Sequence, residues 1–198
     1  MIAAIVPAAG FSTRMGRQNK LLLPYGASTI LGTVLHNLQQ SKAGELLLVT
    51  GKAPGIPGTI ANRERLQVLV NPRAEAGLAG SIQLGIRHAS PQAEAYLICL
   101  ADMPLLQSED YNLLINNYLS IKNKSILIPV RKGMRGNPVL FSRHFKEELL
   151  AAPAGDGCKP VVKANSVSVV QVPVTSEHFF VDIDTPDDYR LYRGKQTG

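Results

Sequence analysis

Acidic and basic side chains that are suited to binding phosphates and a metal ion lie at three places in the chain. Asp102 follows an apolar run, and Asp182 and Asp184 lie in an acidic stretch near the carboxyl end. Arg14 and Lys20 stand six positions apart in a segment that begins with small residues. Mg²⁺ takes one or two protein carboxylates together with phosphates and waters, and guanidinium and ammonium groups bind phosphate oxygens. The residue types therefore suit a metal-assisted site for a phosphorylated ligand.

Asp102, Arg14 and Lys20 also have simple structural interpretations. Asp102 lies two residues before Pro104, so its carboxylate could cap a turn or a helix instead of binding a metal. Arg14 and Lys20 could be solvated cations on a glycine-rich turn. The segment from Pro7 to Lys20, called here the first loop, contains neither a Walker phosphate loop nor the G-x-G-x-x-G fingerprint of dinucleotide-binding folds. The residues alone leave both readings open.

The acidic stretch near the carboxyl end combines a helix start with a pair of unexplained acids. Thr185 or Asp184 can cap a helix that has a proline at its first position and two further acids in its first turn. If residues 181–184 are extended, Asp182 and Asp184 lie on the same face of the strand. Capping of the helix explains Asp187 and Asp188. It gives the pair Asp182 and Asp184 no structural role.

Short apolar runs alternate with helical patterns along the first two thirds of the chain. Such runs, bounded by turn residues, are typical of strands buried on both faces, and they span residues 2–6, 45–49, 66–70, 95–100 and 125–129. Helical apolar stripes cover residues 30–38, 81–88 and 111–118, with Ser28 or Thr29, Ser81 and Ser108 near their starts. The alternation predicts an α/β fold with a mostly parallel sheet, whose ligands bind at the carboxyl ends of the strands.

The last third of the chain is less regular. Residues 138–141 and 167–172 have strand patterns, and residues 145–150 form a short helical pattern. Strands that are not separated by long helices are expected to be antiparallel additions at a sheet edge.

The composition limits the classes of protein to consider. The 198 residues predict one domain over 1–198, and apolar and charged fractions of 45% and 18% exclude intrinsic disorder. No apolar run reaches the roughly 18–20 residues of a membrane span, and two isolated cysteines fit a reduced cytoplasm. The net charge of +6 invites a nucleic-acid partner, but the chain has no Trp and only 6% aromatic residues. We therefore expect phosphorylated small molecules as partners, with no nucleic acid and no membrane.

The first loop resembles the signature of the MobA-like nucleotidyltransferases. Its string PAAGFSTRMGRQNKLLLPYG matches that signature at Ala8, Ala9, Gly10, Ser12, Arg14, Met15, Gly16, Lys20, Leu22 and Leu23. The resemblance implies that this loop wraps a nucleoside triphosphate and that Arg14 and Lys20 contact its phosphates. A second glycine-rich stretch, from Asn71 to Ile82, is similar to another family segment and implies nucleotide contacts at Gly80 and Ser81.

Two acidic motifs extend the resemblance. The stretch around Asp102 is similar to the family's L-x-D-x-P motif, which implies that Asp102 binds the metal and is catalytic together with Arg14 and Lys20. The stretch 182–188 is similar to a family D-x-D-T-P-x-D segment, which implies a second metal-binding acid at Asp182 or Asp184. Asp184 is preferred because it lies nearer the strand end.

The string PAAG and the stretch RGNPV, similar to a family R-G-H-P-V, favour the molybdenum cofactor cytidylyltransferase branch over the guanylyl branch. The resemblance implies a three-layer, Rossmann-like nucleotide-diphospho-sugar-transferase fold with a mostly parallel mixed sheet. It also implies Mg²⁺-dependent transfer of CMP from CTP to the phosphate of molybdenum cofactor, with release of pyrophosphate. A molybdoenzyme or its chaperone would then be a further partner.

Three alternatives to this activity stay open at the level of sequence. GTP could be the donor, or another phosphorylated molecule could be the acceptor. A third alternative is a family member that reduces a pigment with a nicotinamide cofactor, and the missing dinucleotide fingerprint weighs against it.

Overall fold

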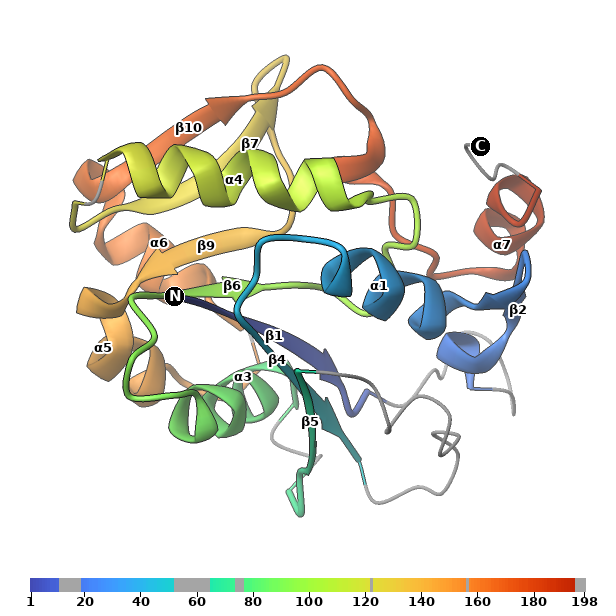
Figure 1. Cartoon of the computed structure of the whole chain (residues 1–198), viewed down its shortest axis with the longest axis horizontal. Helices are drawn as coiled ribbons and strands as arrows, with labels where there is room; N and C mark the ends of the chain where they lie inside the picture. The colour runs from blue at the N-terminus through green and yellow to red at the C-terminus, as the bar shows by residue number, and fades with distance from the viewer. Residues whose placement is uncertain (11–18, 52–64, 74–76, 122, 156, 195–198) are drawn as a thin grey trace.

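The computed structural model describes residues 1–10, 19–51, 65–73, 77–121, 123–155 and 157–194 (Figure 1). Its main sheet has the strand order β10-β7-β9-β6-β1-β4-β5, and β8 pairs with β7. The strands are β1 (Ile2–Ala8), β4 (Glu45–Thr50), β5 (Leu66–Val70), β6 (Ala95–Ile98), β7 (Ile126–Arg131), β8 (Met134–Arg135), β9 (Val139–Ser142) and β10 (Val169–Pro173). A separate small ribbon joins β2 (Pro24–Tyr25) to β3 (Ser28–Thr29).

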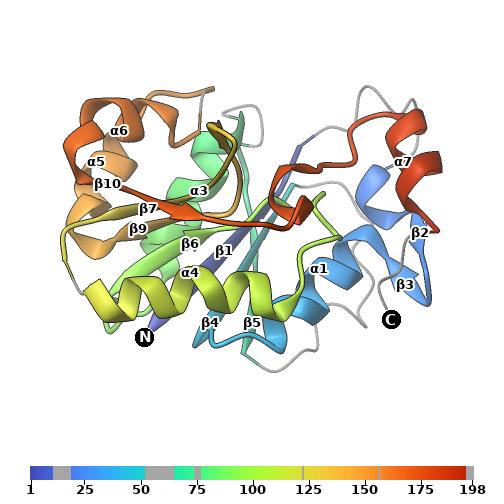
Figure 2. The ribbon, with the colours of Figure 1, turned by 90° about the horizontal axis from the view of Figure 1, so that it is seen from above.

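Helices cover both faces of this sheet, which makes the predicted three-layer α/β architecture (Figure 2). The helices are α1 (Ile30–Gln39), α3 (Gly77–His88), α4 (Ser108–Ile121), α5 (Lys146–Ala151), α6 (Lys159–Ala164) and α7 (Pro186–Tyr192). One core lies between the sheet, α1 and α4, and the other lies between the sheet, α3, α5 and α6. Successive residues of β1 alternate between the two cores, with Ala4 and Val6 in the first and Ala3 and Ile5 in the second. The α/β prediction is confirmed.

The expected antiparallel strand lies inside the sheet and not at its edge. The short β8 hairpin returns the chain directly from β7, so β9 runs antiparallel to both β7 and β6 and separates them. Leu140 and Phe141 of β9 are fully buried, as an interior position requires. At the edge, β10 runs parallel to β7, because α5 and α6 lie between β9 and β10 in the chain and carry it back. The predicted antiparallel direction is therefore confirmed for β9 and wrong for β10, whereas the predicted edge position is confirmed for β10 and wrong for β9.

Several boundaries differ from the sequence pattern. Helix α3 begins at Gly77 and not at Ser81, so capping of the helix by Ser81 is excluded. The cap of α1 is Thr29, whose Oγ1 accepts a hydrogen bond from the Gly32 amide at 3.0 Å. Residues 166–168 form a short 3₁₀ turn, and β10 begins only at Val169. No helix among the described residues has the length and apolar character needed to cross a membrane.

Helix α3 packs against β1 at a glycine, and this contact gives a stability prediction. A Cβ atom on Gly85 would lie 2.5 Å from Cγ2 of Ile5, which is fully buried. Gly85→Ala is therefore expected to lower the free energy of unfolding by about 1–3 kcal/mol through overpacking, as measured by urea denaturation. In an Ile5→Ala background the same change should cost little, because the colliding atom is gone. An equal loss in both backgrounds would show that the contact is not the cause.

Candidate active site

The carboxyl ends of two neighbouring strands bring Ala9 and Gly10 to the same edge of the sheet as Asp102. Strand β1 ends at Ala8, and the chain continues through the buried Ala9 to the exposed Gly10. Strand β6 runs parallel to β1, with Ile98 beside Ile5, and the chain reaches Asp102 four residues later. Parallel neighbours end at the same edge of a sheet, which is where open α/β folds bind ligands.

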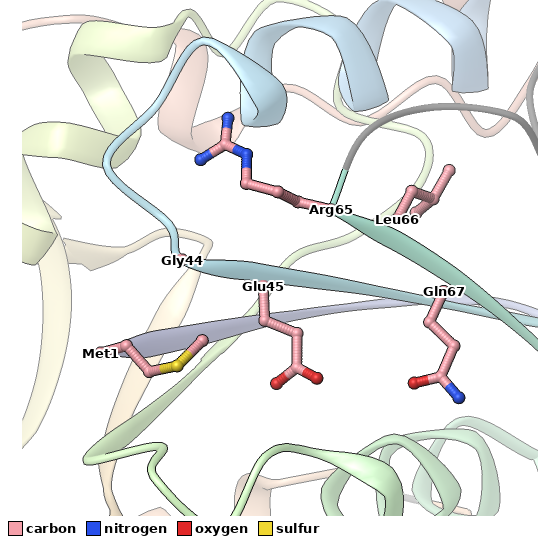
Figure 3. Close-up of a pocket in the computed structure, with 6 residues that line it drawn as sticks. All are labelled: Met1, Gly44, Glu45, Arg65, Leu66 and Gln67. Atoms are coloured by element: carbon pink, nitrogen blue, oxygen red, sulfur yellow. The ribbon is translucent and has the colours of Figure 1, made fainter.

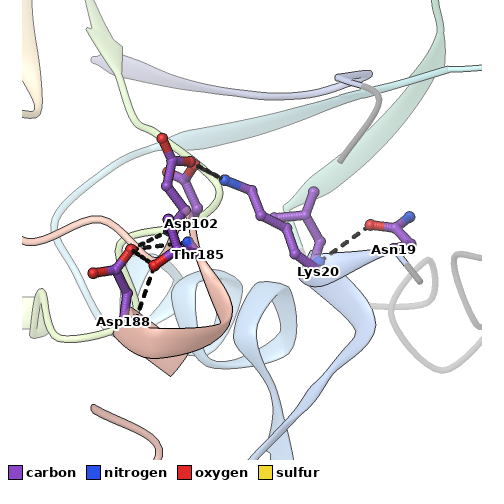
Figure 4. A network of polar contacts seen from close by, with 7 residues as sticks. Asn19, Lys20, Asp102, Thr185 and Asp188 are labelled. Carbon is purple, nitrogen blue, oxygen red and sulfur yellow. Dashed lines mark hydrogen bonds and ion pairs between the residues drawn. The ribbon is translucent and has the colours of Figure 1, made fainter. Parts of the chain in front are cut away.

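Lys20 joins Asp102 to the acidic stretch at the other end of the chain (Figure 4). A short 3₁₀ helix begins at Lys20, and Asn19 caps it by accepting a hydrogen bond from the Leu21 amide at 3.1 Å. Lys20 Nζ donates to Asp102 Oδ2 at 2.6 Å and to Asp184 Oδ1 at 2.5 Å. One ammonium group therefore bridges two carboxylates at the predicted site.

The charges in this cluster shift the pKa values of Lys20 and Asp182. Burial acts to lower the pKa of Lys20, but the adjacent carboxylates of Asp102 and Asp184 outweigh it, so the pKa lies above its ordinary value. Lys20 is thus charged at neutral pH. The stability that its ion pairs give to the folded protein is lost only as the pH rises through this raised pKa. Partial burial of its carboxyl group, together with the negative charges of Asp102 and Asp184, raises the pKa of Asp182. All three acids therefore share one electrostatic environment.

The segment 178–185, called here the acidic strap, carries the acids Asp182 and Asp184. The Ile183 amide donates to the Asp102 carbonyl at 2.9 Å, which aligns the strap with the segment after β6. The strap ends in a capping box, in which Thr185 Oγ1 accepts from the Asp188 amide and Asp188 Oδ2 accepts from the Thr185 amide. The predicted helix start is therefore confirmed at Thr185.

One oxygen of Asp102 indicates that the cluster suits a divalent cation. Asp102 Oδ1 is buried and accepts no hydrogen bond from the described residues, and such an oxygen costs free energy unless something binds it. Within the described ranges, no group of three His, Cys, Asp or Glu side chains could hold a metal. Mg²⁺ and similar hard cations need only one or two carboxylates when substrate phosphates and waters complete the shell. Asp102 and Asp184 fit that ligand set.

The structure describes only some of the remaining predicted site residues. Ser12 and Arg14 lie outside the described residues. Gly80 lies in the first turn of α3, where backbone amides lack intrahelical partners. Ser81 is buried, and its Oγ accepts a hydrogen bond from Asn71 Nδ2 at 3.2 Å, so the structure shows it bonded to the protein.

A hydrogen bond between His178 and Asp110 has no signal in the sequence. His178 Nδ1 lies 2.9 Å from Asp110 Oδ2, and their side chains are 23% and 14% exposed. The two residues are 68 positions apart, and the four histidines of the chain are scattered. The sequence does suggest that Asp110 lies at a helix start, but nothing in it links Asp110 to His178.

A pocket of about 370 Å³ lies at the opposite edge of the sheet (Figure 3). It is lined by Met1, Gly44, Glu45, Arg65, Leu66 and Gln67, at the amino ends of β4 and β5. Its charged groups already have partners, since Glu45 Oε2 accepts from the Ser90 amide and Arg65 donates to the carbonyls of Ala43 and Gln39. It is remote from the Lys20 cluster and is not part of the candidate site.

Comparisons with known proteins show relatives that match nearly the whole chain. The chain is 28% identical over 197 residues to the molybdenum cofactor cytidylyltransferase of Escherichia coli strain K12, over 99% of this chain and 97% of that protein. It is 25% identical over 196 residues to nicotine blue oxidoreductase of Paenarthrobacter nicotinovorans, over 96% of each protein.

Solved structures show the same architecture. The crystal structure of Rv0371c from Mycobacterium tuberculosis matches with a TM-score of 0.83 and 28% identity, over 96% of this chain and 97% of that one. A manganese complex of Rv0371c matches with a TM-score of 0.82 and 25% identity, over 98% and 99% of the two chains. Residues 4–169 match the family model of the MobA-like NTP transferase domain. The chain belongs to the MobA-like NTP transferase family.

Proposed function

We propose that this nucleotidyltransferase of the MobA-like family moves CMP from CTP to the phosphate of molybdenum cofactor and releases pyrophosphate. The observation that carries the proposal is the cluster of Lys20, Asp102 and Asp184, with a buried and unbonded carboxylate oxygen, at the edge where β1 ends. The name of the E. coli relative and the cytidylyl-type motifs support CTP as the donor and molybdenum cofactor as the acceptor.

The transfer needs a direct displacement at phosphorus. An oxygen of the acceptor phosphate forms a bond to the α-phosphorus, the bond to the β-phosphate breaks, and pyrophosphate takes up the electron pair. Such a reaction depends mainly on positioning and on stabilisation of charge. Asp102 and Asp184 would hold Mg²⁺, which when bound neutralises negative charge on the phosphates. Lys20 and Arg14 would orient the triphosphate, with Ala8, Ala9, Gly10, Ser12, Gly80 and Ser81 around the nucleotide.

No covalent intermediate with the protein is required. Burial raises the pKa of Cys99 far above neutrality and that of Cys158 to about 12. Both cysteines are therefore neutral thiols at physiological pH, and neither supplies a thiolate nucleophile. The direct displacement agrees with this chemistry.

Donor choice is tested by thermal protection and by product mass. With Mg²⁺ present, CTP is expected to raise the melting temperature more than GTP does, because CTP is the proposed donor and a ligand that binds the folded state stabilises it. Incubation with each of the four triphosphates, Mg²⁺ and molybdenum cofactor should then yield a product heavier by a CMP group only with CTP. Equal or stronger protection by GTP would contradict the donor. Protection by a reduced nicotinamide dinucleotide, without any triphosphate effect, would favour an activity like that of the Paenarthrobacter relative.

A further inference from the structure

The acidic strap is held to the rest of the protein at four points along its length. His178 is paired with Asp110 on α4 at 2.9 Å. The carbonyl of Phe179 accepts a hydrogen bond from the Asn137 amide at 2.9 Å. Further along, the Ile183 amide donates to the Asp102 carbonyl, and Asp184 Oδ1 accepts a hydrogen bond from Lys20 Nζ at 2.5 Å. Two of these contacts join side chains from different parts of the chain, His178 with Asp110 and Asp184 with Lys20.

This contact closes a ring that contains both metal-binding acids. Asp110 comes eight residues after Asp102, and His178 comes six residues before Asp184. The hydrogen bond from Ile183 to the Asp102 carbonyl joins the same two segments near the acids. The pair His178–Asp110 therefore fixes the far ends of two segments whose near ends carry the ligands.

Asp110 is itself held in place, so it can serve as a fixed anchor. Its Oδ2 also accepts a hydrogen bond from the Gln107 amide at 2.9 Å, where the chain enters α4. Because a carboxylate only accepts hydrogen bonds, Nδ1 of His178 must carry the proton and donate. Burial of Phe179 and Ile183 supplies apolar anchoring of the strap independently, and one partly exposed hydrogen bond adds little net stability of its own. The specific contribution of the pair is orientation of the strap.

We infer that His178 and Asp110 are positioning residues that set the place of Asp184 relative to Asp102 and so tune the affinity for the divalent cation. This inference rests on the metal role of the two acids in the proposed function. Neither His178 nor Asp110 is placed in contact with the metal or the substrate. Residues that orient metal ligands without touching the metal themselves commonly change metal affinity when they are replaced.

The test separates the hydrogen bond from the packing of the ring. His178→Phe keeps the ring volume and loses the donor, whereas His178→Asn loses the ring and keeps a donor near the position of Nδ1. We expect His178→Phe to weaken binding of Mn²⁺ about tenfold, measured with Mn²⁺ alone by the electron paramagnetic resonance signal of the free ion. His178→Asn should bind Mn²⁺ nearly as tightly as the wild type. Hydrogen exchange at the Ile183 amide should be faster in His178→Phe alone.

The control is His36→Ala, which removes an exposed histidine on α1 and should leave both measurements unchanged. Wild-type affinity and exchange in His178→Phe would overturn the inference. The reverse pattern, with His178→Asn impaired and His178→Phe normal, would show that packing of the ring matters and would also overturn it. If the wild-type protein itself binds no Mn²⁺, the proposed metal site is wrong. Hydrogen exchange at the Ile183 amide would still show whether the pair His178–Asp110 holds the strap in place.

Discussion

Replacement of Asp102 by asparagine is expected to lower the rate of pyrophosphate release by about a hundredfold or more while leaving the fold intact. The side chain contributes one oxygen to Lys20 at 2.6 Å and a second, buried oxygen that no described residue satisfies. An amide keeps the shape of the carboxylate but loses the negative charge, and its nitrogen cannot bind a cation. The fold is expected to survive because Lys20 keeps its ion pair with Asp184.

The measurement is a coupled assay of pyrophosphate with CTP, Mg²⁺ and acceptor, accompanied by a thermal melt of each variant. Asp187→Asn is the matched control, because Asp187 is an exposed acid on α7 whose partner is the exposed Arg190. The control should retain wild-type turnover. Turnover by Asp102→Asn at the wild-type rate would remove Asp102 from the mechanism.

Lys20→Met is expected to lower kcat by a comparable factor, about a hundredfold. Methionine keeps the apolar stem and removes the charge that separates Asp102 from Asp184, so the two carboxylates repel each other. The charge of Lys20 also lowers the pKa of Asp182. Without it that pKa rises further, so the acid protonates at a higher pH. The activity that remains is therefore expected to fall off at a higher pH on the acidic side than in the wild type.

A pH–rate profile of both proteins tests this second prediction. Lys42→Met is the control, since Lys42 is an exposed lysine whose Nζ bonds to Asn116 Oδ1. Lys20→Arg keeps the charge with a different shape and should retain more activity than Lys20→Met. An unchanged acidic limb in Lys20→Met would show that Lys20 does not control the acids of the strap.

Local pattern was sufficient to predict most elements that support the site. Strand β5 has the bounds that its apolar run predicts, and Thr29 caps α1 as one of two candidates. Strand β1 extends past its predicted end, because Pro7 stays in the strand beside Val49 although proline weakens a ladder. Helix α3 begins four residues early, at Gly77, although two of the residues in its first turn are glycines with low helix propensity.

Contacts between distant segments were the part that sequence could not supply. Asp102 and Lys20 were each predicted in the site from their motifs, but the bond between them joins residues 82 positions apart. The choice of Asp184 over Asp182 as the partner of Lys20 likewise depends on how the strap folds back. Tertiary packing determines the interior position of β9 and the contact of His178 with Asp110. The local pattern of apolar and polar residues contains no information about either.

The long separations within the Lys20 cluster have a consequence for when the protein can first act. Its three side chains come from the beginning, the middle and the end of the chain, with Lys20 and Asp184 164 positions apart. During synthesis Lys20, Asp102 and the sheet strands up to β6 are made before the strap. A nascent chain that stops short of residue 184 lacks one of the three charges, whatever it has already folded. We therefore expect the complete charge cluster to form only late in synthesis, after the strap has been made.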